Sequence, residues 1–371
     1  MRVLDKITRL DTSQSSLQLC IKTISSGDLE QEDILSILQI IRNHPASDSM
    51  VLLFADKFHL GLEPAMRSQM LQNLVNRSLA LPVDQRLPAV DWLLDIKESK
   101  LAEGVLPLSD ALSSPKSFEM WVEVAIDLKR WSDIDKALAN TANPLPPYRT
   151  QALEATIAGI KGNPGKSREL WDSVLSKNKN RPEVFLELLV MLIRLGEWKI
   201  LYQELPVLLN DPAWALKSME TLIPVARQHR DSVLMLEFYR QAMKCRIIAN
   251  ADTIKDRAAY TRLILGESVR PEELEQRSKK NPENLSFRMT YALGLLKNGA
   301  KVKALFELKD VEPSIQVDAL LPHQKAVYAA ILHANGQAED AQAILKTISS
   351  ETLTHQEEAL TSAISAAHKV D

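Results

Sequence analysis

The chain has 371 residues, of which 45% are hydrophobic, with 11 glycines and a formal net charge of −3 at pH 7. This hydrophobic content excludes wholesale disorder, and two cysteines, Cys20 and Cys245, are too few and too far apart for a disulfide framework. The net charge gives no general attraction to nucleic acid or to an anionic membrane. Scarce glycine and apolar stretches rich in Leu, Ala and Ile predict an all-α protein.

Apolar patterning in the first third of the chain predicts helices without a regular repeat. Six helical stretches are expected between residues 13 and 114, the last of them LAEGVLPLSDAL, residues 101–112. We interpret residues 1–114 as three irregular helical pairs that lead into a repeat array. The N-terminal stretch MRVLDKITRLDTSQ contains no apolar signal core.

The strongest apolar run of the chain is VFLELLVMLI, residues 184–193. It is interrupted by Glu187 and is too short to cross a bilayer. We therefore expect no membrane insertion by these residues. The expected location is the cytoplasm or, if an N-terminal signal was removed, the soluble part of a tethered or exported protein.

The stretch GNPGKS, residues 162–167, raises the question of a phosphate-binding loop. That loop needs a glycine, four residues and then Gly-Lys-Ser, but Ile160 occupies the place of the first glycine. Pro164 lacks the amide hydrogen that a phosphate cradle uses, and the preceding residues have a helical composition where a buried strand is required. The stretch is therefore predicted to be a turn between two helices that binds no nucleotide.

The same turn belongs to a repeat with a period of about 34 residues. Extending the spacing between Gly162 and Gly196 places one turn in each unit, at Lys129, Gly162, Gly196, Arg230, Leu265, Gly299 and Gly336. A nearly constant period of this size is the pattern of stacked helical pairs.

Two further positions of each unit are apolar throughout. Seven residues before the turns stand Val122, Ala155, Leu189, Ile223, Ala258, Ala292 and Ala329. Nine residues after the turns stand Leu138, Trp171, Leu205, Tyr239, Leu274, Leu308 and Leu345. The first set suits the crossing of two helices, so Ala155 is expected to be buried there, and the second set suits the seam with the next unit.

These residues resemble the tetratricopeptide repeat (TPR) family, whose units are helix-turn-helix pairs with small residues at the helix crossing. The resemblance covers residues 115–350, although the early Trp-Leu-Gly-Tyr signature of the family is mostly absent. It implies a right-handed solenoid of antiparallel helix pairs. In residues 351–371, the capping box Thr354-His355-Gln356-Glu357 predicts a C-terminal capping helix that covers the last apolar seam.

No pattern of catalytic or metal-binding residues stands out. The seven histidines are scattered, without HExxH pairing or cysteine partners, and no GxSxG motif occurs. The lysine and asparagine clamp by which the family grips a C-terminal carboxylate is not matched. The sequence therefore predicts a protein that is not an enzyme and that has no cofactor and no metal site.

Outward positions on the first helix of each unit predict a groove whose later part is basic. The basic candidates are Arg149, Arg194, Lys217, Arg227, Lys255, Arg262 and Lys297. Arg227 and Arg262 are one repeat step apart and are expected to engage successive carboxylates through forked hydrogen bonds. The hypothesis is that an acidic segment of another protein lies in this groove, and a merely solvated face is the alternative.

The leading function is a non-enzymatic scaffold or adaptor that binds another protein, because an open solenoid offers an extended surface. One alternative is a helical-repeat nucleic-acid-binding protein. The negative net charge and the mixed groove argue against it, so nucleic acid is not an expected partner. Another alternative is a non-catalytic subunit of an enzyme or of a secretion or assembly complex.

Overall fold

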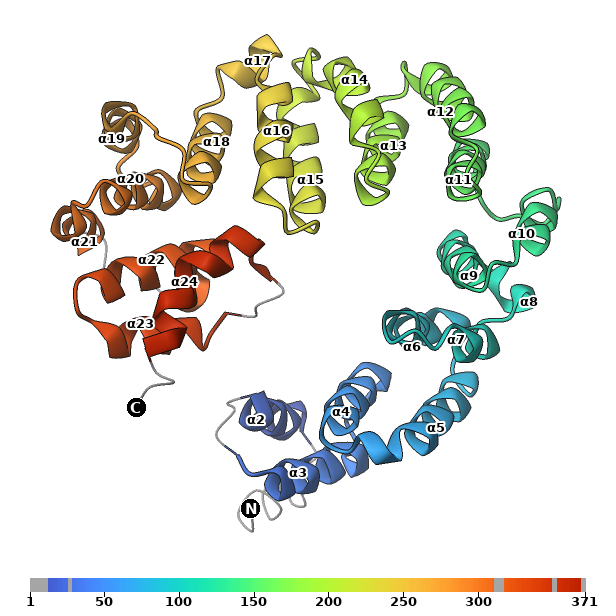
Figure 1. The fold of residues 1–371 in the computed structure, drawn as a ribbon. Coiled ribbons are helices and arrows are strands. Elements are labelled where there is room, and N and C mark those ends of the chain that lie inside the picture. Colours follow the sequence, from blue (N-terminus) through green and yellow to red (C-terminus); the bar gives the residue numbers. More distant parts are fainter. Residues whose placement is uncertain (1–12, 26–28, 310–316, 349–351, 368–371) are drawn as a thin grey trace. The chain divides into compact units, whose positions relative to one another are not determined.

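A computed structural model of the protein describes residues 13–25, 29–309, 317–348 and 352–367. Within these ranges the chain consists of helices and turns with no β-strand, which confirms the all-α fold class (Figure 1). Most of the N-terminal stretch in which a signal core was sought, residues 1–12, lies outside the described residues. None of the described helices combines the length and the apolar character that a membrane crossing requires.

The chain divides into two compact units, residues 1–154 and 155–371, and the division falls within α11 (Pro147–Ile160). Before α11, the first unit contains α2 (Gln14–Ser25), α3 (Gln31–Asn43), α4 (Ser49–Leu62), η1 (Pro64–Met66), α5 (Arg67–Leu79), α6 (Val83–Asp95), α7 (Ser99–Val105), α8 (Leu108–Ala111), α9 (Pro115–Asp127) and α10 (Trp131–Leu138). The segments 1–114, 115–350 and 351–371 were inferred from where the repeat is regular. The two units are defined by compactness instead, so they do not test these segments, which stay a prediction.

After α11, the second unit contains α12 (Pro164–Asn178), α13 (Pro182–Arg194), α14 (Trp198–Leu209), α15 (Ala215–Arg227), α16 (Ser232–Ala242), α17 (Arg246–Ala249), α18 (Asp252–Ile264), α19 (Pro271–Lys280), α20 (Leu285–Lys297), α21 (Lys301–Lys309), η3 (Val317–Ala319), α22 (Pro322–Ala334), α23 (Ala338–Leu345) and α24 (His355–Ala367).

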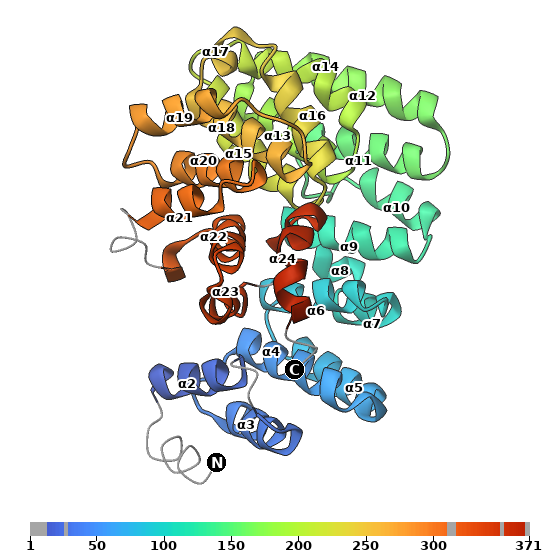
Figure 2. The same cartoon turned by 60° about the vertical axis from the view of Figure 1, so that its left-hand side comes forward.

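Helices of the second unit pack mainly on their near neighbours in the chain. α13 contacts α14 and α15, α16 contacts α14 and α18, and α20 contacts α18, α21 and α22. This pattern buries a continuous apolar seam between successive helix pairs. At the C-terminal end, α22, α23 and α24 form a mutually packed group, which Figure 2 shows together.

The turns predicted from the repeat share one backbone conformation. A residue in the left-handed region ends the first helix of the pair at six of the predicted positions, with φ between 54° and 83°: Lys129, Gly162, Gly196, Arg230, Gly299 and Gly336. The remaining prediction was wrong by one residue, because Gly266 (φ 78°), and not Leu265, has this conformation. Glycine adopts it without the steric cost that a Cβ atom imposes.

Backbone hydrogen bonds explain why these turns recur. At Gly196, the amide of Glu197 donates to the carbonyl of Leu192 and the amide of Gly196 donates to that of Ile193, both at 2.9 Å. This paired arrangement satisfies the last carbonyls of the helix and requires the left-handed residue. The same pair of bonds occurs at Lys97 (φ 63°), so a turn of this type lies within the region where no regular repeat was expected.

The apolar positions of the repeat are buried as predicted, with one partial exception. All seven residues assigned to the helix crossings are buried, and Ala155 has no exposed surface. Six of the seven residues assigned to the seams are buried as well, whereas Leu345 is half-buried beside the buried Ile344.

The stretch 101–112 was predicted to be one helix, and this was wrong. α7 ends at Val105, and α8 begins at Leu108 after the non-helical Leu106 and the extended Pro107. Proline has no amide hydrogen and disfavours helical geometry in the residue before it, which accounts for the break.

The GNPGKS stretch joins α11 to α12, and the prediction of a helix-helix turn is confirmed. Gly162 has a φ of 79°, and the side chain of Asn163 caps α12 by accepting a hydrogen bond from the amide of Lys166 at 3.1 Å. The amide of Lys166 is therefore already used by the cap, and Ser167 is buried. Neither group is presented as a phosphate cradle requires.

Replacing Ala155 with Leu is expected to overpack the helix crossing and to lower the free energy of unfolding by roughly 1 to 3 kcal/mol. Urea denaturation followed by circular dichroism measures the change. The matched control is Ala343→Leu at an exposed position of α23, where little effect is expected. An unchanged denaturation midpoint for Ala155→Leu would contradict the assignment of this position to a crossing.

The GNPGKS turn is expected to bind no nucleotide, because its cap occupies the amide of Lys166 and no strand precedes it. Thermal melts with ATP or GTP and magnesium should match melts without nucleotide. An upward shift of the melting temperature that disappears in Lys166→Ala would show that this expectation is wrong.

Candidate functional site

The seven basic residues predicted to form the groove lie at different places in the two units. Arg149 belongs to the first unit and forms an ion pair with Glu119 at 3.1 Å. The other six belong to the second unit. Lys217 and Lys255 lie in the first turns of α15 and α18. Arg194, Arg227, Arg262 and Lys297 lie in the last turns of α13, α15, α18 and α20.

These six residues form two rows at opposite ends of the first helices. Ten residues of helix, as between Lys217 and Arg227, extend about 15 Å along the axis, so the structure does not gather the six at one point. The last-turn row (Arg194, Arg227, Arg262 and Lys297) also places positive charge where the helix dipole favours it.

The residues of the two rows differ in how they are engaged. Arg194 and Lys297 are exposed. The ammonium group of Lys217 lies 4.2 Å from the ring centre of Trp214, and that of Lys255 lies 3.9 Å from a carboxylate oxygen of Asp252. Arg262 binds Glu267 at 3.0 Å and the carbonyl of Ser268 at 2.7 Å. Arg227 binds a residue that is far away in the sequence, Glu357 of α24.

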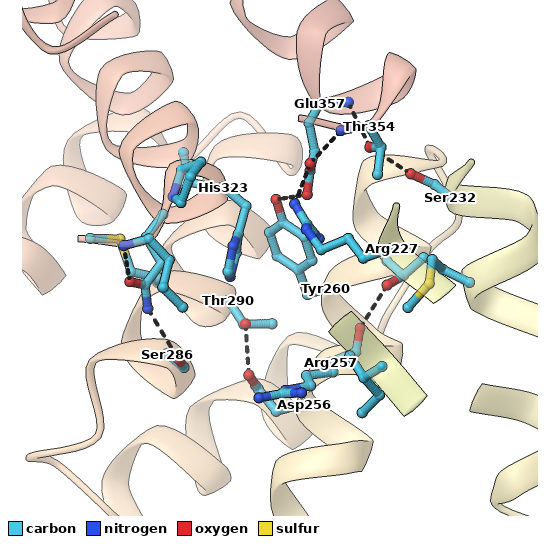
Figure 3. A pocket seen from close by; sticks show the side chains of 18 of the residues that line it. Arg227, Ser232, Asp256, Arg257, Tyr260, Ser286, Thr290, His323, Thr354 and Glu357 are labelled. Carbon is cyan, nitrogen blue, oxygen red and sulfur yellow. Dashed lines mark hydrogen bonds and ion pairs between the residues drawn. The ribbon is translucent and has the colours of Figure 1, made fainter. Parts of the chain in front are cut away.

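A cavity of about 340 Å³, with polar side chains on a largely apolar wall, surrounds Arg227 (Figure 3). Helices α15, α16, α18, α20 and α22 contribute to its wall, as do Thr354 and Glu357 at the start of α24. Its ionisable side chains are Arg227, Tyr239, Asp256, Arg257, Tyr260, His323 and Glu357. The cavity thus brings together residues from these five helices and from the start of the C-terminal helix.

Glu357 is the most buried carboxylate of this cavity, with 1% of its side chain exposed. It accepts hydrogen bonds from Arg227 at 2.5 Å, from the hydroxyl of Tyr260 at 2.9 Å and from the amide of Thr354 at 2.8 Å. Burial alone would raise the pKa of Glu357, but the charge and hydrogen bond of Arg227, helped by the Thr354 amide, hold that pKa below its usual value. Glu357 is therefore ionised at neutral pH.

The capping box predicted at the start of α24 is present. In addition to the Thr354 amide bond, the amide of Glu357 donates to the Thr354 hydroxyl at 3.3 Å. Further along the helix, Leu360 and Ile364 pack on the apolar core that α18 to α23 form. The box holds Glu357 in a fixed orientation at the helix start, while the apolar residues anchor the rest of α24.

The start of α24 also binds the turn between α15 and α16. Arg230 donates to the carbonyl of Leu353 at 2.7 Å and forms an ion pair with Glu358. The carbonyl of Arg230 accepts from the amide of His355 at 3.1 Å, and the Ser232 hydroxyl donates to that of Thr354 at 2.9 Å. Segments more than 120 residues apart are joined by these contacts.

Asp256 lies on the opposite wall of the cavity and is 3% exposed. Burial raises its pKa to about 7, although the hydrogen bond from the Thr290 hydroxyl, at 2.9 Å, and the charges of Arg277 and Arg257 act in the opposite direction. His323 is affected in the reverse sense, because burial and the charge of Arg227 lower its pKa to about 4. At pH 7 His323 is therefore neutral, and Asp256 is close to half-protonated.

The polar groups of the cavity mainly bind one another. Arg227, Tyr260 and Glu357 form one network, and Asp256 and Thr290 form a second pair. Among the residues that the structure describes, no group of three or more His, Cys, Asp or Glu could hold a metal ion. The arrangement is suited to holding a helix whose first turn is acidic, because its arginines and hydroxyls bind the carboxylates and the backbone at that end.

Sequence reasoning identified Arg227 and the capping box separately but missed that they meet. The one signal available was Arg230, which occupies a left-handed position where five of the other units have glycine. An arginine costs conformational energy at such a position, which suggests that its side chain is used.

Asp256 is expected to make stability depend on pH between about 4 and 7. Its folded pKa lies above the usual value of 3.8, so the stabilisation is complete below that value and is lost as the pH rises through about 7. Asp256→Asn cannot ionise and retains an oxygen that accepts from Thr290. Between pH 5 and pH 8 it should therefore lose less stability than the unmodified chain, by a few kcal/mol at most, since one pKa unit is worth roughly 1.4 kcal/mol.

Urea denaturation midpoints at the two pH values measure this difference. Asp252→Asn is the matched control on the same helix, because the hydrogen bond from Lys280 lowers the pKa of Asp252 and removes its titration from this range. Equal pH dependence in the unmodified chain and in Asp256→Asn would show that this carboxyl is not perturbed.

No protein-family model matches this chain, and no curated protein matches it in sequence. The side chains around Arg227 and Glu357 therefore indicate what this protein can bind.

Proposed function

We propose that the protein is a non-enzymatic scaffold of tetratricopeptide type that binds an acidic segment of another protein along its second unit. One observation carries the proposal. The surface formed by Arg227, Arg230 and Ser232 binds an acidic helix start, which is that of α24 in the same chain. A surface with this chemistry is equally suited to an acidic helix of a partner.

The last-turn row extends this chemistry along the unit. Arg194 and Lys297 are exposed at the ends of α13 and α20, in the position that Arg227 occupies on α15. A partner segment that follows the row would meet a positive side chain on successive first helices. Surface charges of this kind chiefly accelerate encounter and set the register of binding, so affinity should fall as salt rises.

The cavity supports a binding role better than a catalytic one. Its most strongly perturbed groups are accounted for by burial and by their mutual hydrogen bonds, and ion-pair networks with a structural role perturb pKa values in the same way. The nucleic-acid alternative gains no support, because Glu357 and Glu358 of α24 already pair with Arg227 and Arg230.

The test measures how much each basic row contributes to the affinity for a protein partner. The partner is first identified by capture on the immobilised full chain. The double variant Arg194→Glu with Lys297→Glu should weaken binding of the purified partner about tenfold at low salt, which corresponds to roughly 1.4 kcal/mol. The double variant Lys217→Glu with Lys255→Glu changes the charge equally at the other ends of the helices and should bind nearly normally.

Titration calorimetry at two salt concentrations gives the affinities, and circular dichroism verifies the fold of each variant. Equal binding by both double variants would contradict a role for the last-turn row. Retention of RNA by the full chain, with loss of binding after nuclease treatment, would favour the nucleic-acid alternative.

A further inference from the structure

We infer that the surface around Arg227 recognises one kind of partner element, a helix that is preceded by Thr or Ser and has Glu at its third and fourth positions. In this chain α24 is a displaceable occupant of that site. The inference rests on the proposed function and names both its partner and its regulation. It requires that the contacts made by α24 are specific to that helix start and that a second helix can replace them.

Specificity follows from what each position of the helix start contacts. The hydroxyl of Thr354, which precedes the helix, binds Ser232 at 2.9 Å. The third residue, Glu357, is buried against Arg227 and Tyr260, and the fourth, Glu358, pairs with Arg230. A helix without glutamate at its third position would leave Arg227 and Tyr260 without a carboxylate acceptor. An unsatisfied donor in a buried site is costly.

The site also binds the backbone of a helix start. The carbonyl of Arg230 accepts from the amide of His355, one of the first amides of α24, which lacks a partner within its own helix. The Arg230 guanidinium binds the carbonyl of Leu353 just before the helix. These two contacts require a helix N-terminus but no particular side chain, so a helix of another protein can make them equally well.

Exchange of α24 for a partner helix is favoured because the contacts between α24 and the α15–α16 turn are polar and partly exposed. The side chains of Arg227 and Arg230 remain 28% and 29% exposed. A partner helix with apolar residues at the positions of Leu360 and Ile364 would also replace the contacts of α24 with the core. Because α24 is tethered, its effective concentration is high, so a partner competes only when it binds tightly or when α24 is weakened.

The test uses the full chain and a fluorescent peptide with the sequence of residues 352–367. In the chain, Glu357→Gln with Glu358→Gln weakens the tethered helix and leaves the site itself unchanged. Fluorescence anisotropy should show that the peptide binds this variant at least tenfold more tightly than it binds the unmodified chain. A peptide carrying the same two substitutions should lose that gain.

A second substitution locates the site. Arg230→Gly, added to the weakened chain, keeps the left-handed turn but removes the guanidinium, and peptide binding should fall at least tenfold. Lys129→Gly in the same background is the matched control, since it replaces another left-handed basic residue (φ 57°) and should leave binding unchanged. Binding that is insensitive to Arg230→Gly would overturn the inference.

A covalent lock makes the test independent of the stability of these variants. The hydroxyls of Ser232 and Thr354 are 2.9 Å apart, so cysteines at both positions are placed to form a disulfide. The oxidised Ser232→Cys, Thr354→Cys chain should bind no peptide, and reduction should restore binding to the level of the unmodified chain or above. Equal peptide binding in the oxidised and reduced forms would show that α24 does not occupy the peptide site.

The outcomes separate this inference from the proposed function. If the peptide experiments fail while the partner still depends on Arg194 and Lys297, the scaffold proposal stands and α24 is a fixed structural helix. If the partner binds without regard to either basic row, the scaffold proposal itself fails for this surface.

Discussion

The structure depends on the left-handed residue that ends the first helix of each pair. At every such turn except that of Arg230, the amide that follows donates back to the helix, so that the chain reverses within a few residues and the second helix packs on the first. Recurrence of this residue at a nearly constant spacing is what aligns the buried crossing positions. Arg230 has the same left-handed conformation, and its carbonyl and its guanidinium both bind the start of α24.

The ion pair of the partly exposed Arg227 with the buried Glu357 adds a contact between residues 130 positions apart to a fold that otherwise consists largely of contacts between neighbours. A buried carboxylate such as Glu357 is expensive to desolvate, so the ion pair is weak evidence for stability. Here the carboxylate also accepts from Tyr260 and from the Thr354 amide, so its hydrogen-bonding capacity is well satisfied. Its clearest consequence is specificity, because few other arrangements of the helix start would satisfy Arg227.

The repeat could be predicted because it depends on local chemistry. Gly196 and Gly299 mark turns by their conformational freedom, and Ala155 and Ala292 mark crossings by their size, so period and burial followed from residue types alone. The Gly266 turn was misplaced by one residue because Leu265 fitted the average spacing, and the break at Pro107 was missed within an apolar pattern. The meeting of Arg227 with Glu357 depends on how the helix pairs from α15 to α23 stack in space, and no local pattern encodes that.

The two halves of α24 contribute to binding in different ways. Leu360 and Ile364 contribute apolar burial, which rewards any amphipathic helix and discriminates poorly between sequences. The first turn discriminates between helices because a wrong sequence loses binding free energy there. An apolar residue in place of Glu357 would leave the guanidinium of Arg227 and the hydroxyl of Tyr260 without their acceptor. Placing the acidic turn at the helix start strengthens this selection, because only there do free backbone amides meet the carbonyl of Arg230. The surface therefore selects the end of a helix rather than its side, which is a narrower requirement than charge complementarity alone.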